Sequence, residues 1–174
     1  PPPPHPSPPP RLWIPNVEPY EQLYPVRFLR QELRCDGGGA GEFRGGPGID
    51  YEVLMEYPVV MHFRSEGIGE PSGYGVCDGR PGLGGAMEVT ESRDVHHVPP
   101  AYGTREYKSC TYHALSPGGG GWGHPHNRNL DAVLRDVRDG LVSSQAAREL
   151  YGVVLTDDTK EVDMSATSQL RGSE

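Results

Sequence analysis

The segment SPGGGGWGHP, residues 116–125, places four consecutive glycines between two different sequence patterns. Before it, YKSCTYHAL (107–115) alternates well enough between apolar and polar residues to predict a strand. After it, NLDAVLRDVRDG (129–140) carries apolar residues at helical spacing and predicts a short helix. The glycine segment is therefore predicted to be a close-packed turn that joins the last strand of a sheet to a helical region.

The region after the glycines has the signals of a helical hairpin. Asn129 is a favourable N-cap residue, and Gly140 is the type of residue at which helices stop. Either Ser143 or Ser144 caps a second helix, which ends at Gly152.

The region before the glycines is predicted to be rich in strands and turns. A second glycine-rich segment, DGGGAGEFRGGPGID (36–50), lies between strands rather than between a strand and a helix. The predicted elements are a strand at 26–33 after the bend at Tyr24–Pro25, one or two strands within 51–63 broken at Pro58, a short strand at 86–90 and a loop at 92–100.

The predicted fold class is α+β, a loop-rich β-sheet domain with a carboxyl-terminal helical hairpin. We expect three parts along the chain. They are a proline-rich tail at 1–16, a domain at 17–155 whose last strand is 153–155, and a polar tail at 156–174.

The glycine runs could cradle a phosphate or could let two parts of the fold come close. A Walker loop needs GxxxxGK[ST], but His124 and Pro125 follow the first run and no lysine is present there. A dinucleotide fingerprint needs GxGxxG before a helix, and residues 37–48 fail at the third glycine and precede a strand. We therefore interpret the glycines as structural, because glycine permits positive φ and close backbone approach. These structural glycines are Gly37, Gly38, Gly39, Gly41, Gly45, Gly46, Gly118, Gly119, Gly120, Gly121 and Gly123. Valine at Gly119 or Gly120 is expected to disrupt folding or assembly by blocking positive φ.

Composition excludes several classes of function. The net charge is −8 and no cluster of Lys and Arg is present, which argues against nucleic-acid binding. The sequence has no apolar run long enough to span a membrane and no signal peptide, so a cytoplasmic location is expected. Three widely spaced cysteines, Cys35, Cys77 and Cys110, are predicted to be reduced thiols rather than a disulfide framework or a zinc site.

The sequence contains no constellation that indicates catalysis by this chain alone. His124 and His126 are two residues apart, but Pro125 between them disfavours a regular strand. Cys110 and His113 would point to opposite faces of a strand. We therefore expect no catalytic, cofactor-binding or metal-binding residue here.

Two long stretches resemble the hydantoinase B/5-oxoprolinase family. One is RFLRQELRCDGGGAGEFRGGPGIDYEV, residues 27–53; the other is SPGGGGWGHPHNRNLDAVLRDVRDGLVSSQAARELYGVV, residues 116–154, which is similar to that family's carboxyl end. The segment EPYEQLYPVR also looks like the family, and the resemblance covers roughly residues 17–155. The sequence departs from the family pattern at Cys35–Gly37, at His124, where Asp is common, and in the loosely matching middle, 67–112.

The resemblance implies a place in a larger enzyme. B-type chains of this family work with hydantoinase A-like partners that bind ATP, and a divalent metal is expected in the partner subunits rather than here. Expected partners are these A-like subunits and the larger remainder of a B-type subunit.

Two hypotheses follow from this resemblance, and a third follows from the proline-rich tail. The preferred one is a small, mainly structural subunit or fragment of an ATP-dependent carboxylase of the acetophenone/acetone type. The alternative is part of an ATP-dependent cyclic-amide hydrolase of the hydantoinase/5-oxoprolinase type. A third is an autonomous protein-binding module.

Overall fold

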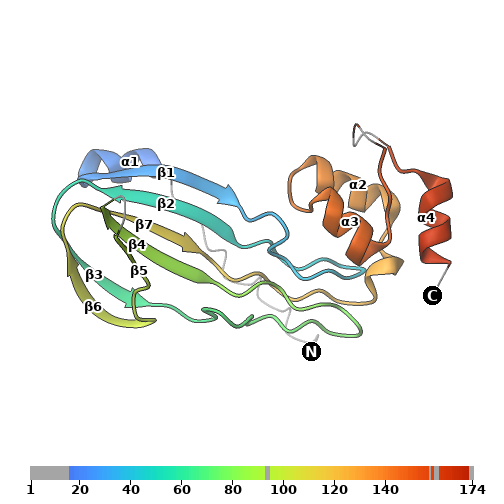
Figure 1. Ribbon diagram of the computed structural model, residues 1–174, viewed down its shortest axis with the longest axis horizontal. Helices are drawn as coiled ribbons and strands as arrows, with labels where there is room; N and C mark the ends of the chain where they lie inside the picture. The colour runs from blue at the N-terminus through green and yellow to red at the C-terminus, as the bar shows by residue number, and fades with distance from the viewer. Residues whose placement is uncertain (1–15, 93–94, 157, 159–160, 173–174) are drawn as a thin grey trace, which may run out of the picture.

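The computed structural model describes residues 16–92, 95–156, 158 and 161–172. The molecule is elongated, with the strands and a short amino-terminal helix at one end, the remaining helices at the other and glycine-rich loops between them (Figure 1). The helices at the far end are α2 (Leu130–Arg138), α3 (Ser144–Tyr151) and α4 (Met164–Arg171). This arrangement confirms the predicted α+β class and the helical hairpin. The predicted proline-rich tail lies outside the described residues except for Asn16.

The main sheet has five antiparallel strands in the order β1-β2-β7-β4-β5. They are β1 (Val26–Leu33), β2 (Ile49–Met55), β7 (Cys110–Leu115), β4 (Ala86–Ser92) and β5 (Val95–His97). A short helix, α1 (Val17–Leu23), precedes β1, and the Glu21 carboxylate accepts a hydrogen bond from the Phe28 amide at 2.7 Å. The neighbouring strands β2 and β7 connect directly to the glycine-rich loops (Figure 1).

A two-stranded ribbon, β3 (Val59–Arg64) and β6 (Tyr102–Tyr107), forms a second sheet. Its inward side chains share a hydrophobic core with the main sheet. Phe63, Tyr107, Val89 and Ala114 are buried in this core, and the rings of Phe63 and Tyr107 meet edge to face with centroids 6.3 Å apart. Burial alternates along β3, as expected for a strand with one covered face.

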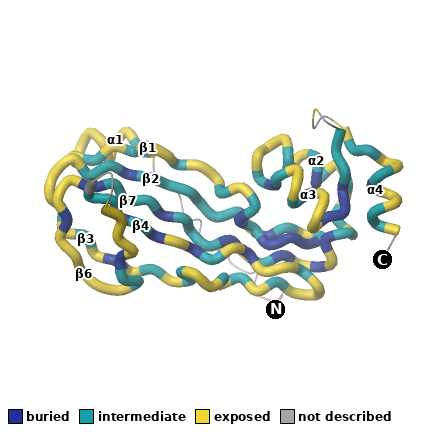
Figure 2. Tube along the Cα trace, in the orientation of Figure 1, coloured by how far each residue is buried: buried dark blue, intermediate teal, exposed yellow. Residues whose placement is uncertain are grey.

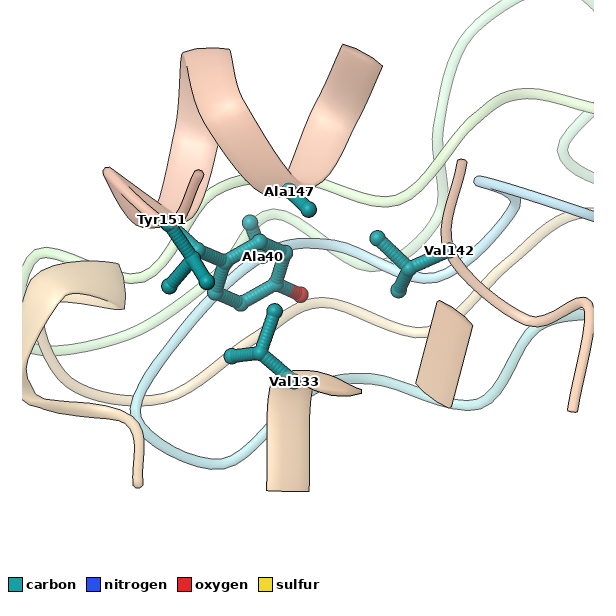
Figure 3. Close-up of a cluster of buried hydrophobic side chains, with 6 residues drawn as sticks. Ala40, Val133, Val142, Ala147 and Tyr151 are labelled. Atoms are coloured by element: carbon teal, nitrogen blue, oxygen red, sulfur yellow. The ribbon is translucent and has the colours of Figure 1, made fainter. Parts of the chain in front are cut away.

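A second core lies where the glycine loops meet the helices. Tyr151 is 1% exposed, and its ring lies among Ala40, Val133, Val142 and Ala147 (Figure 3). Ala40 belongs to a glycine loop and the other residues to the helical region, so this core joins the two. Burial continues from it into the glycine-rich loops (Figure 2).

Several predicted elements differ from the structure. The strand predicted at 107–115 is interrupted, because the chain reverses at Lys108–Ser109 between β6 and β7. The Ser109 hydroxyl donates to the Met55 carbonyl oxygen at 3.0 Å and fixes this turn. The loop predicted at 92–100 contains β5, which forms by pairing at the sheet edge with β4. Helix α1 and most of β6 were not predicted.

The carboxyl-terminal residues also differ from the prediction. Residues 153–155 form only an isolated bridge between Leu155 and Val162 instead of a strand. The segment predicted as a polar tail contains α4, whose buried Thr167 accepts a hydrogen bond from the Val154 amide at 3.0 Å. Arg171 donates to the Tyr151 carbonyl oxygen at 2.9 Å. Part of the predicted tail is therefore a helix, which is bonded to the end of α3 and to the segment that follows it. The domain limits at 17 and 155 stay predictions.

Within the part of the chain that the structure describes, no helix is both long and apolar enough to cross a lipid bilayer.

Candidate functional site

The candidate site is the set of glycine-rich loops between the sheet and the helices, here called the glycine bundle (residues 37–48, 73–83 and 118–123). Segment 118–123 follows β7, and segment 37–48 connects β1 to β2. Segment 73–83 doubles back on itself, since the Gly79 amide donates to the Val76 carbonyl oxygen at 3.0 Å. Main-chain hydrogen bonds between these three segments hold them side by side.

Hydrogen bonds between these segments repeat every three residues. Between segments 118–123 and 73–83, the Gly118 amide donates to the Leu83 carbonyl oxygen and the Gly121 amide to that of Arg80, both at 2.9 Å. Between segments 73–83 and 37–48, the Leu83 amide donates to the Gly37 carbonyl oxygen at 2.9 Å and the Arg80 amide to that of Ala40 at 2.7 Å. A repeat of three is that of the extended polyproline II helix, which forms no hydrogen bonds within one chain and must find partners in neighbouring segments. The bundle therefore holds together through main-chain bonds, without regular strands or helices.

Close approach explains why so many positions are glycine. A Cβ on Gly118 would lie well under 3.0 Å from the Gly37 carbonyl oxygen, and a Cβ on Gly121 would lie 2.3 Å from that of Ala40. Such contacts would force backbone to move. Gly119 differs: it is exposed, and a Cβ there would meet the Gly46 nitrogen at 3.2 Å.

The predicted structural glycines lie together in the glycine bundle. At most of them, glycine is favoured by close backbone approach and not by positive φ. Gly123 has φ of 75°, whereas no residue from 118 to 121 has positive φ. The expectation that valine at Gly119 or Gly120 would act by blocking positive φ is therefore wrong in its reason. The structure separates these two positions, since a Cβ on Gly120 would collide with the Gly75 backbone. Gly37, Gly38, Gly39, Gly41 and Gly45 are likewise crowded by backbone atoms, whereas a Cβ on Gly46 would meet nothing within 4 Å.

Five of the six amide groups in the central segment, 118–123, donate to backbone carbonyl oxygens. Donors within 118–123 bond to backbone carbonyls as follows: Gly118 to Leu83, Gly119 to Gly46, Gly121 to Arg80, Trp122 to Phe43 and Gly123 to Val76. A phosphate-binding loop needs amides that point at the anion. The geometry of this segment is that of a packed structural element.

A buried carboxylate ties the bundle to the helices. Asp136 on α2 is 7% exposed and accepts hydrogen bonds from Arg44 Nε at 3.2 Å and from Arg128 Nη2 at 2.8 Å. Each arginine also donates to a bundle carbonyl, Arg44 to Gly45 at 2.8 Å and Arg128 to Glu42 at 2.9 Å. Sequence reasoning missed this network, because its members lie in three separate segments and none carries a local signal.

A second contact fixes the start of α3. The Asp36 side chain accepts a hydrogen bond from the Ser143 amide at 2.8 Å, and the Asp36 amide donates to the Leu141 carbonyl oxygen at 3.0 Å. Ser143 is itself the N-cap, accepting from the Ala146 amide at 3.0 Å. Asp36 has positive φ (57°), a conformation that Asp tolerates better than most residues.

The histidines in the described part of the chain have partners of different kinds. The rings of His124 and His126 meet edge to face with centroids 4.9 Å apart, and His113 Nε2 lies 2.8 Å from the Asp50 carboxylate. Burial works against ionisation of Asp50, but its hydrogen bonds with His113 and Arg30 outweigh it and lower the pKa of that carboxyl. Among the described residues, no three His, Cys, Asp or Glu side chains gather as a metal site would require.

The cysteines are free thiols. Cys35 and Cys77 are exposed and Cys110 is buried, and burial raises the pKa of the Cys110 thiol. A raised pKa makes a thiol a poorer nucleophile at neutral pH.

Comparison with known proteins places the chain among much longer polypeptides. A model of the family described as Hydantoinase B/oxoprolinase matches residues 7–125. The beta subunit of the caprolactamase of Pseudomonas jessenii is 36% identical over 166 residues, 91% of this chain and 28% of the relative. The B-type subunit of a putative D-/L-hydantoinase from Pseudomonas sp. NS671 is 33% identical over 158 residues, 89% of this chain and 26% of the relative. The chain thus spans about a quarter of the length of these relatives.

Two solved structures share the fold. The crystal structure of the ATP-dependent caprolactamase from Pseudomonas jessenii matches with a TM-score of 0.74 at 32% identity, over 91% of this chain and 28% of that chain. The nucleotide-free structure of acetone carboxylase matches with a TM-score of 0.69 at 20% identity, over 92% of this chain and 26% of that one.

Proposed function

Because the chain belongs to the hydantoinase B/oxoprolinase family, we propose that it is a mainly structural scaffold within the B-type subunit of an ATP-dependent enzyme that hydrolyses a cyclic amide. The observation that carries this proposal is the glycine bundle. Its crowded glycines and its bonded amides suit a rigid element better than a nucleotide loop.

ATP is proposed to bind a hydantoinase A-like partner, and a divalent metal to lie in the partner subunits. The P. jessenii relative is described as ATP-dependent, and both relatives are described as subunits. Five of the six amides in 118–123, which could have held a phosphate, donate to carbonyl oxygens instead. This supports a division of labour in which the chain described here positions other parts of the enzyme.

The cyclic-amide hydrolase is the better supported of the two enzyme types. By sequence, the caprolactamase and hydantoinase subunits are 36% and 33% identical to this chain, whereas the acetone carboxylase alpha subunit is 24% identical. In the structural matches, caprolactamase is 32% identical and acetone carboxylase 20%. The names of the caprolactamase and hydantoinase subunits point to lactam and hydantoin rings as the substrate class. The small size of the chain alone favours the carboxylase, because a separate small chain fits a complex with several subunits. The sequence identities favour the hydrolase, and we therefore place it first. Carboxylation of a ketone stays the second candidate, because its enzyme shares the fold.

The test is made on the assembly that contains this chain, purified from its source and characterised by native mass spectrometry. With ATP present, we expect ring opening of caprolactam, hydantoin or 5-oxoproline, detected by mass spectrometry of the products. Omitting ATP is the control. ATP-dependent incorporation of labelled bicarbonate into acetone or acetophenone would overturn the hydrolase in favour of the carboxylase. A free 19.0 kDa monomer in the source extract would overturn the proposed place in a larger enzyme and favour an autonomous binding module.

A further inference from the structure

One surface of the glycine bundle carries exposed apolar side chains from three segments. The Phe43 and Trp122 amides each donate to the other residue's carbonyl oxygen, at 3.0 and 2.9 Å. Residues that exchange both bonds lie directly opposite each other, with side chains on the same face. Their rings accordingly meet with centroids 5.6 Å apart.

Val76 extends this surface on the other side of Trp122. The Val76 amide donates to the Gly121 carbonyl oxygen at 2.9 Å, and the Gly123 amide donates to that of Val76 at 3.0 Å. These bonds form a parallel bridge between Val76 and Trp122. The three side chains make one row, here called the aromatic row (Phe43, Val76 and Trp122), with exposures of 63%, 58% and 48%.

The aromatic row has the composition of a protein interface. Trp and Phe are enriched in interface centres, and polar residues usually surround them. Here Glu42, Asp78 and Arg80 flank the row in sequence, and Asp78 and Arg80 are exposed. The backbone beneath the row is held by the bundle, so a partner would meet a surface that is already ordered.

The turn beside Val76 is held in a demanding conformation. Cys77 and Asp78 both have positive φ, 51° and 69°. Neither residue is a glycine, and residues with a side chain rarely adopt this conformation. Cys77 is exposed and directly follows Val76 in the chain, so its thiol can report on access to this part of the surface.

We propose that the aromatic row is the docking surface for the remainder of the hydantoinase B-type polypeptide. This inference rests on the proposed function. Nearly three quarters of each relative's chain lies outside the region matched by this chain. The matched region therefore belongs to a much larger protein in those relatives. The aromatic row lies on the hydrogen-bonded glycine bundle, and we infer that the rest of that larger protein packs against it.

The experiment uses the natural assembly and the native Cys77 thiol as a reporter. Alkylation of Cys77 by iodoacetamide is followed by peptide mass spectrometry in the assembly and in the separated chain. We expect at least a tenfold slower reaction in the assembly.

A second experiment measures binding of the doubly substituted chain, Phe43→Ala with Trp122→Ala. It should bind the remainder of the B-type polypeptide at least about 30-fold more weakly, the loss typical of removing one interface hot spot. Val98→Ala, at an 83% exposed residue outside the bundle, is the matched control and should leave binding unchanged.

The outcomes separate this inference from the proposed function. If the wild-type chain is found in no assembly, the proposed function fails and this inference with it. If the chain assembles but Cys77 reacts equally fast in both forms and the double variant still binds, only the aromatic row is overturned. If the double variant unfolds, the Cys77 comparison on the wild-type chain still decides the matter.

Discussion

Replacing Gly45 by alanine should destabilise the protein strongly, whereas the same change at the adjacent Gly46 should not. A Cβ on Gly45 would lie 2.9 Å from the Gly120 carbonyl oxygen and still closer to the Gly119 carbonyl. Inserting an atom into such a packed site costs about 1–3 kcal/mol. The required shift also weakens the bonds from Gly39 to Gly119 and from Gly45 to Gly39, now 2.8 and 2.9 Å long. Losing two such bonds adds about 0.5–1.5 kcal/mol each.

The free energy of unfolding of Gly45→Ala should therefore fall by roughly 2–6 kcal/mol, a large part of the total for a domain of this size. Urea unfolding measured by intrinsic fluorescence gives this value. At Gly46, which is exposed, alanine should be neutral or should stabilise by about 0.4–1 kcal/mol, because it restricts the unfolded chain. Equal unfolding free energies for the two variants would refute close backbone approach as the reason for glycine in the bundle.

Three further changes test contacts between the bundle and the helices. Asp136→Asn should lower the free energy of unfolding by about 3–5 kcal/mol, because it leaves two largely buried arginine side chains, 13% and 14% exposed, without their counter-charge. The exposed Asp139→Asn is the control, and a loss as small as that of the control would contradict the argument. Burial raises the pKa of Tyr151 from 10.0 to about 12, so its contribution to stability is full below pH 10 and is lost as the pH rises through 12. Tyr151→Phe should therefore flatten the stability profile between pH 10 and 12, and an unchanged slope there would count against it. Ser143→Ala should cost about 0.5–2 kcal/mol through the lost N-cap, measured by thermal unfolding, whereas alanine at the exposed Ser144 should cost no more than a few tenths.

The helical hairpin could be predicted from sequence because its signals are local. The Asn129 side chain accepts a hydrogen bond from the Ala132 amide at 3.1 Å, as an N-cap does. Gly152 ends α3 with φ of 62°, in the left-handed region typical of a helix stop. Each signal lies within a few residues of the element that it marks. The family was also predicted correctly, since its motifs are long and continuous in sequence.

The bundle and its contacts depend on residues distant in sequence and were predicted only in outline. The sequence shows that glycine is abundant at 118–121, but it cannot show which neighbouring segment crowds each position. Gly119 and Gly120 look equivalent in sequence, yet a Cβ would lie 2.3 Å from the nearest backbone atom at Gly120 and 3.2 Å from the nearest one at Gly119. Arg44 and Asp136 are 92 residues apart, so their contact exists only once the loops are assembled. Strand β5 likewise arises from edge pairing rather than from its own composition.

The main-chain bonding of the glycine bundle has a consequence for spectroscopy. Far-ultraviolet circular dichroism detects helices and sheets, and these segments belong to neither. A dichroism spectrum would therefore assign the glycine bundle to irregular coil and suggest that this part of the protein is poorly ordered. Its amide protons, however, are bonded across segments, and several, such as those of Gly118 and Gly121, are buried. Hydrogen–deuterium exchange should report the opposite of the spectrum, with slow exchange in residues that dichroism assigns to disorder.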